Sequence, residues 1–298
     1  MVDINNIPDI PSSEIKPRDK KDYRCAPSQE FSNGSCISLI LLIEMAKAYN
    51  QTDNQKPIKL SKTLETLNPK KYKKYLIKEF SNRLDKVCDD QRCWVKQDFI
   101  EKINKKYREA LKKDTFRPAG PEGRFDWLST FNINDVMGQY EYKYNNFKFL
   151  GAVPIDFDEL PTLGISNLDF NDLIKKGKTK IGIVFNLDEH YKSGTHWISL
   201  YACLDSGCCY FFDSFGIEPN KRIRKFMRKI ANFIQNDLKK KPNVDYNRVR
   251  HQKDGYSCGV YSVSFIIKML EGRKFEDIII DKNFDDALML KNREVFFT

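Results

Sequence analysis

The chain has 298 residues, of which 41% are hydrophobic and 31% are charged, and its formal net charge is +10. These values predict a soluble protein of one large or two modest domains with a real hydrophobic core, and they exclude a wholly disordered chain. The longest apolar stretch, Ile37–Ile43, is far shorter than the roughly 18 residues that cross a bilayer, so we expect no transmembrane helix.

Residues 1–29 are polar and contain four prolines, so we expect an irregular lead-in without a secretory signal peptide. Eight cysteines are too few for a disulfide scaffold in a chain of this length. We therefore expect reduced thiols in a reducing compartment, one of them a candidate for a reactive group.

Four segments with helical spacing follow the lead-in: Ile37–Tyr49, Leu60–Leu67, Tyr72–Val87 and Val95–Leu111. Residues 1–118 carry 25 Lys and Arg against 17 Asp and Glu, and the prolines and glycines of Phe116–Gly123 mark a boundary. We predict a basic helical N-terminal arm at 1–118 and a core domain at 119–298. The basic arm suggests nucleic acid as a partner, although exposed Lys-rich helices are common.

Strand patterns dominate beyond the boundary. Short β-prone runs bounded by Gly, Asp or Pro occur at Lys180–Leu187, Trp197–Leu204, Cys209–Phe212 and Val244–Arg250. Asn220–Leu238 reads as an amphipathic helix with a basic face. Cys258–Glu271 reads as a largely buried helix that Gly272 ends.

Cys258 is the first residue of that buried helix. Unpaired backbone N–H groups at a helix start stabilise a thiolate, which makes the sulfur nucleophilic near neutral pH. The plain alternative is a small buried hydrophobic residue, the usual state of a free cysteine.

His196 and Asp213 begin and end a predicted β-hairpin, which places imidazole and carboxylate side by side. A carboxylate bound to one ring nitrogen fixes the tautomer and leaves the other nitrogen for a thiol. Gln252 lies six residues before Cys258, so its amide and the backbone N–H of Cys258 could donate to an oxyanion. The residues therefore favour a thiol protease.

Three motifs resemble a known family: Thr195-His196-Trp197, Phe212-Asp213-Ser214 and the Gln252-to-Gly259 run with the pattern Gln-x5-Cys-Gly. Their types and order are similar to those of the adenovirus-protease and SUMO-deconjugase superfamily of cysteine peptidases. Leu128–Asp135, Arg250–Gln252 and parts of the arm further resemble the polyprotein-processing proteases of the African swine fever virus type in large DNA viruses. Residues 70–115 look like an insertion.

The resemblance implies an α+β, papain-like core with a central mixed sheet flanked by helices, preceded by a helical arm. It also implies cleavage after Gly-Gly motifs in viral structural polyproteins during virion maturation, in the host cytoplasm at the virus factory and in the virion, without a metal or organic cofactor. Two departures stand out. Asp213 replaces the asparagine of the viral type, and the Trp-Leu-Asn-Asp motif of the deconjugases is only partly matched, by Trp127 or by Phe131–Asp135.

The resemblance assigns roles residue by residue. Cys258 is the nucleophile, His196 its acid–base partner, Asp213 the orienting group and Gln252 an oxyanion donor. Trp197, Gly259 and Trp127 are the expected substrate-binding residues.

Other interpretations stay open. The same chemistry fits a deconjugase that cuts the isopeptide bonds of SUMO or ubiquitin-like modifiers. A non-catalytic, nucleic-acid-binding virion protein would use the basic arm. Cys36 is a weak alternative nucleophile, and Cys88 with Cys93 could be half a zinc site, but packing thiols are the favoured interpretation of all three.

Overall fold

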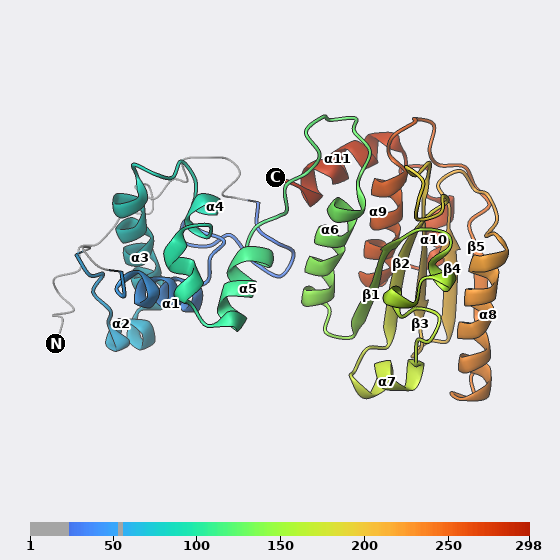
Figure 1. Cartoon of the computed structure of the whole chain (residues 1–298), viewed down its shortest axis with the longest axis horizontal. Coiled ribbons are helices and arrows are strands. Elements are labelled where there is room, and N and C mark those ends of the chain that lie inside the picture. Colours follow the sequence, from blue (N-terminus) through green and yellow to red (C-terminus); the bar gives the residue numbers. More distant parts are fainter. Residues whose placement is uncertain (1–23, 53–55) are drawn as a thin grey trace. The chain divides into compact units, whose positions relative to one another are not determined.

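The computed structural model describes residues 24–52 and 56–298, which form two compact units. The first unit runs to Pro118 and also includes Thr298, and the second spans Ala119–Phe297. Figure 1 labels the elements of both. Among the helices of the described residues, none is both long and apolar enough to cross a membrane.

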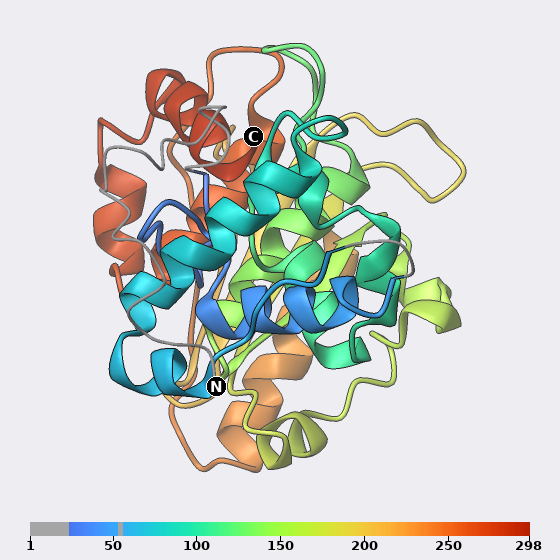
Figure 2. The ribbon, with the colours of Figure 1, turned by 90° about the vertical axis from the view of Figure 1, so that its left-hand side faces the viewer.

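The first unit is helical and has its own hydrophobic core. Side-chain oxygens of Ser38, Ser61, Asn68, Asp90 and Asn104 cap the helix starts, as these residue types do well. Figure 2 views this unit from the side, with α3 next to α1. The elements are α1 (Leu39–Tyr49), α2 (Lys62–Leu67), α3 (Pro69–Leu84), α4 (Gln91–Trp94), a 3-10 helix (Asp98–Lys102) and α5 (Lys105–Lys113).

The single helix predicted over Val95–Leu111 is wrong. Ile103 is extended, with φ −75° and ψ 143°, and the Asn104 side chain accepts from the amide of Lys106 to start α5 anew. A local side-chain cap competes here with continuous helix, which apolar spacing alone does not reveal. The described part of the predicted lead-in, residues 24–29, is irregular apart from a bridge at Cys25, and residues 1–23 lie outside the described residues.

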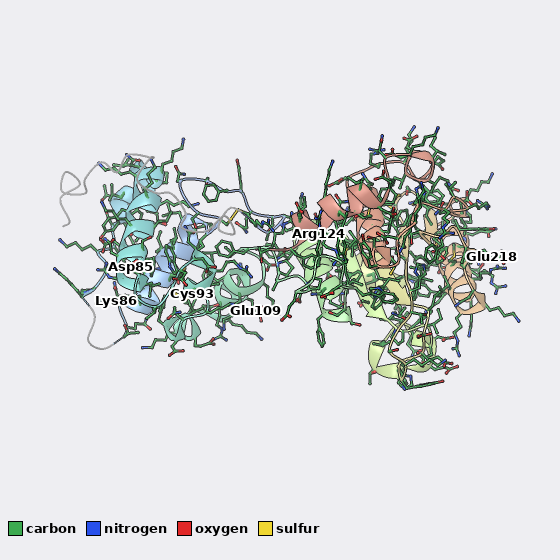
Figure 3. The ribbon with its side chains drawn as sticks, turned by 90° about the horizontal axis from the view of Figure 1, so that it is seen from above. Asp85, Lys86, Cys93, Glu109, Arg124 and Glu218 are labelled. Carbon is green, nitrogen blue, oxygen red and sulfur yellow. A yellow bond between two sulfur atoms is a disulfide. The ribbon has the colours of Figure 1, made fainter. Side chains whose placement is uncertain are left out.

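Four of the eight cysteines, expected to be reduced, are paired in disulfides. Cys25 bonds to Cys36 and Cys88 bonds to Cys93, with Cα–Cα distances of 5.3 and 5.4 Å; Cys93 is labelled in Figure 3. Both separations are ordinary for a disulfide. A count of cysteines could not show this, because pairing depends on which side chains the fold brings together.

The second unit is built on a five-stranded mixed sheet of order β1-β2-β3-β4-β5. The outer pairs β1/β2 and β4/β5 are parallel, while β2/β3 and β3/β4 are antiparallel. This confirms the predicted α+β architecture. The strands are β1 (Phe147–Val153), β2 (Lys180–Asn186), β3 (Trp197–Cys203), β4 (Cys208–Phe212) and β5 (Asn243–Tyr246).

Helices cover both faces of the sheet (Figure 1). One face packs on α6 (Thr130–Lys143) and α9 (Cys258–Leu270), in a core that also includes residues of α10 (Phe275–Ile280) and α11 (Asp286–Phe296). The other face packs on α7 (Phe170–Lys175) and α8 (Lys221–Asn236). Strands covered on both sides read as nearly continuous apolar runs, and every residue of β3 and β4 is buried. Short 3-10 turns at Phe157–Glu159 and Pro161–Leu163 complete the unit.

Candidate active site

The β3–β4 hairpin places His196 and Asp213 at one end of the sheet. Their strands pair antiparallel, with Ser199 opposite Phe212, so the residue before β3 and the residue after β4 come together. His196 Nε2 and Asp213 Oδ1 are 2.8 Å apart, and both residues are buried. The predicted juxtaposition of imidazole and carboxylate is therefore present.

Neighbouring groups fix both partners of this pair. The amide of Phe215 donates to Asp213 Oδ1 at 2.8 Å, and Asn247 Nδ2 donates to the carbonyl oxygen of Asp213 at 2.7 Å. The ring of Phe215 stacks on the imidazole of His196, with centroids 4.5 Å apart and an interplanar angle of 12°. Phe215 was not predicted as part of the site, although it lies two residues after Asp213.

Cys258 begins α9, as predicted, and its side chain is 2% exposed. The N-cap residue Ser257 makes no side-chain capping bond to the helix, so its hydroxyl does not occupy the amides of the first turn. His196 is hydrogen-bonded to Cys258 as well as to Asp213. Because Nε2 meets Asp213, Nδ1 is the ring nitrogen left available for the thiol.

The protonation of His196 follows from these contacts. Burial lowers the pKa of the imidazole, but hydrogen bonds to Asp213 and Cys258 outweigh burial and raise the pKa to about 9. The ring therefore carries a proton at neutral pH. An imidazolium beside a thiol favours the thiolate, which is the nucleophilic form of cysteine.

Gln252 is buried beside this group, but the contacts of its Nε2 lie within its own loop. Nε2 donates to the carbonyl oxygen of Asp254 at 3.0 Å and to its Oδ1 at 3.1 Å, while Oε1 accepts from Ser214 Oγ at 2.6 Å. An oxyanion would have to share this amide with Asp254. The oxyanion role of Gln252 thus stays a prediction.

Two carboxylates organise the loop before Cys258. Asp254 accepts from the amides of Tyr256 and Ser257 and from Ser257 Oγ. Asp286, the first residue of α11, accepts from the amides of Lys253 and Asp254 and from Tyr261 Oη. Cys258 therefore follows a loop in which the backbone amides of residues 253, 254, 256 and 257 are held by carboxylates.

A cavity of about 460 Å³ lies beside Trp197, the residue after His196. Its lining includes Trp127 and Trp197, two of the three residues expected to bind substrate, but not Gly259. Trp197 Nε1 donates to the carbonyl oxygen of Leu128 at 2.8 Å. A Cβ on Gly259 would lie 3.0 Å from Leu128 and 3.2 Å from Trp197. The start of α9 therefore packs closely on Leu128 and Trp197, and a side chain at position 259 would require one of them to move.

The remaining histidines lie elsewhere. His190 lines the cavity and pairs with Asp156, with Nδ1 and Oδ2 2.6 Å apart, and His251 Nδ1 lies 3.1 Å from the carbonyl oxygen of Phe284. Within residues 24–52 and 56–298, no group of three His, Cys, Asp or Glu side chains could hold a metal ion. The half zinc site considered for Cys88 and Cys93 is a disulfide instead.

The sequence is similar to a known protein family and to individual viral proteases. The model of the Ulp1 protease family, C-terminal catalytic domain, matches residues 176–294. A "Putative thiol protease" of Acanthamoeba polyphaga mimivirus is 36% identical over 262 residues, covering 86% of this chain and 87% of the relative. A SUMO-1 cysteine protease of African swine fever virus is 22% identical over 242 residues, covering 72% and 86%.

The fold has a solved counterpart. The crystal structure of the selenomethionine form of the African swine fever virus protease superposes with a TM-score of 0.60 at 17% identity, covering 93% of this chain and 96% of that protein. At this low sequence identity the similarity supports the fold alone, that is, the mixed sheet with helices on both faces.

Proposed function

The chain belongs to the Ulp1 protease family and is a cysteine protease, and on this premise we propose that it cleaves viral structural polyproteins after Gly-Gly-type motifs during virion maturation. The observation that carries the proposal is the close packing of Leu128 and Trp197 on Gly259, the residue after Cys258. From this packing we infer a narrow passage to the sulfur, with little room for side chains on the substrate. Glycine, which lacks a Cβ, suits such a passage.

The chemistry follows from the contacts of the site. The Cys258 thiolate attacks the scissile carbonyl carbon and forms an acyl-enzyme. The His196 imidazolium gives its proton to the leaving amine, and the resulting imidazole then activates the water that hydrolyses the thioester. Asp213 holds the ring and stabilises its charge. The N–H of Cys258, with Gln252 if its amide turns from Asp254, receives the oxyanion.

Viral relatives support a role in infection. We place the protein at the virus factory in the host cytoplasm and in the virion, where a maturation protease meets its precursors. The basic arm adds nucleic acid as a second proposed partner, and salt-dependent binding of the intact protein to duplex DNA would test it.

A peptide with a Gly-Gly-X site tests the proposal, alongside the same peptide with Ala-Ala-X. The intact protein should cleave the first and not the second, and Cys258→Ala should lower kcat/KM by at least about 10³-fold. Cys208→Ala is the matched control, because Cys208 is also a buried free thiol and burial raises its pKa. Equal activity of the Cys258 and Cys208 variants would contradict the assignment of the nucleophile.

Deconjugation is the second candidate, because the African swine fever virus relative is described as a SUMO-1 protease. SUMO conjugates and the Gly-Gly-X peptide should therefore be compared at equal enzyme concentration. Faster cleavage of the conjugates would reverse the order of the two functions while leaving the mechanism unchanged.

A further inference from the structure

Arg293 of α11 is a buried cation outside the catalytic group described above. It is 7% exposed, and its Nη1 donates to the backbone carbonyl oxygen of Asp126 at 2.6 Å. Its Nη2 is buried and has no hydrogen-bond partner within the part of the chain that the structure describes. A buried guanidinium with an unpaired donor lowers the stability of the fold. We therefore look for a role of Arg293 other than packing.

The groups around Arg293 belong to the site. Burial lowers the pKa of the guanidinium, and the charges of Asp126, Asp254, Tyr256 and Cys258 act against that effect. Arg293 therefore faces two segments together, the one that contains Asp126 and the loop that ends at the nucleophile. Asn292, its neighbour on α11, donates to Ser264 Oγ of α9 at 2.9 Å and fixes the helix that carries it.

Residues 123–128, which we term the strap, carry Trp127 to the wall of the cavity. A local hydrogen bond stabilises the strap: the amide of Gly123 donates to Asp126 Oδ2 at 2.7 Å. Phe125 lies on Tyr256 of the nucleophile loop, with ring centroids 4.9 Å apart. At its end, Leu128 accepts from Trp197 and touches Gly259. Arg293 holds the middle of this segment, at the residue directly before Trp127.

We propose that Arg293 is a positioning residue for this protease, which holds the strap beside the nucleophile so that Trp127 forms one wall of the substrate passage. The proposal rests on the proposed function for its substrate. Arg293 does not touch the reacting atoms. It acts through Asp126 and Trp127, and the contact of Phe125 with Tyr256 joins the strap to the loop that presents Cys258.

Limited proteolysis tests the strap without any assay of activity. The strap contains a tryptic site after Arg124, an exposed residue labelled in Figure 3. In the intact protein, Arg293→Met should speed native-state cleavage after Arg124 about fivefold or more, because the strap opens more often. Lys291→Met is the control, because it removes one positive charge from an exposed position of the same helix; it should leave the rate unchanged. Equal rates in wild type and Arg293→Met would overturn the proposal.

A double-mutant cycle tests the effect on substrate. Arg293→Met should raise KM for the Gly-Gly-X peptide about five- to tenfold with kcat within about twofold, and Arg293→Lys, which can still donate to Asp126, should recover part of the loss. If Arg293 acts through Trp127, adding Arg293→Met to Trp127→Ala should change KM no further. Independent, additive effects would overturn the positioning role. Should neither peptide be cleaved by any variant, the proposed function fails, while the proteolysis result still decides whether Arg293 holds the strap.

Discussion

A carboxylate, rather than the amide that the family resemblance implied for the viral type, faces the imidazole of His196. Asp213 contacts His196 Nε2 from within a buried pocket, and the stacked ring of Phe215 keeps water from one side of the imidazole. A negative charge in such a place stabilises the imidazolium more strongly than an amide dipole does. The protonated state of His196 should therefore persist to higher pH than in a cysteine protease with asparagine.

The pH dependence of activity tests whether the Asp213 carboxylate raises the pKa of His196. Because His196 must be protonated to serve the leaving amine, kcat/KM should fall as the pH rises through about 9. Asp213→Asn removes one of the groups that raise the pKa of His196, so the basic limb should move to lower pH. Asp245→Asn, which changes a partly exposed partner of Arg248, should leave the limb in place. A basic limb that is the same in Asp213→Asn and wild type would show that the carboxylate does not set this pKa.

Residue types and spacing were enough to propose Cys258, His196 and Asp213, because a nucleophile at a helix start and a hairpin that joins base to carboxylate are local features. Arg293 and Asp286 could not be proposed in this way. They lie on α11, 35 and 28 positions after Cys258, and they reach the site only because that helix packs on α9. The place of Gln252 beside the site could be predicted from its spacing to Cys258, but its hydrogen bond to Asp254 could not.

Among the elements, the buried strands were the easiest to predict. β2, β3 and β4 differ from their predicted spans by one residue at an end, since they are continuous apolar runs. β1 was missed. It contains Lys148 and Gly151, and its register with β2 shifts between Phe149 and Ala152, so neither alternation nor a continuous apolar run marks it. β5 ends at Tyr246 because the chain then turns through Asn247, whose side chain bonds to its neighbours.

The loop before Cys258 should affect activity although none of its own side chains attacks the substrate. Asp254→Ala removes the acceptor for the amides of Tyr256 and Ser257, so the N–H of Cys258 loses its fixed direction. We expect kcat to fall about 10- to 100-fold, less than the loss of a whole oxyanion donor. Asp254→Asn keeps an acceptor oxygen and should retain most of the activity. Asp277→Ala, an exposed change on α10, is the control.

The rate of thiol alkylation should accompany that measurement, because it separates positioning from unfolding. Cys258 in Asp254→Ala should still react with iodoacetamide at a rate close to that of wild type, since His196 remains its partner. Unchanged kcat in Asp254→Ala would mean that the backbone of the loop holds its shape without the carboxylate.

At the scale of the whole molecule, each unit has its own core. The apolar cluster of the first unit runs from Cys36 to Phe116, and the two clusters of the second begin at Leu128 and Val153. The change from helical to strand patterns and the prolines near residue 118 are local signals, so a boundary could be proposed there from the sequence. The disulfides of the first unit carry no such signal, because their partners meet only in the folded chain.

This separation predicts how the molecule responds to reduction. Both disulfides lie in the first unit, and the free thiols of the described chain, Cys258 among them, lie in the second. Loops of 11 and 5 residues give disulfides worth about 2–3 kcal/mol each, so reduction should lower the melting temperature of one calorimetric transition by roughly 10 °C or more. The transition of the second unit should stay in place. Replacing Cys25 and Cys88 by Ser should reproduce the effect of reductant and abolish any further response to it. A single transition that shifts as a whole would show instead that the two units unfold together.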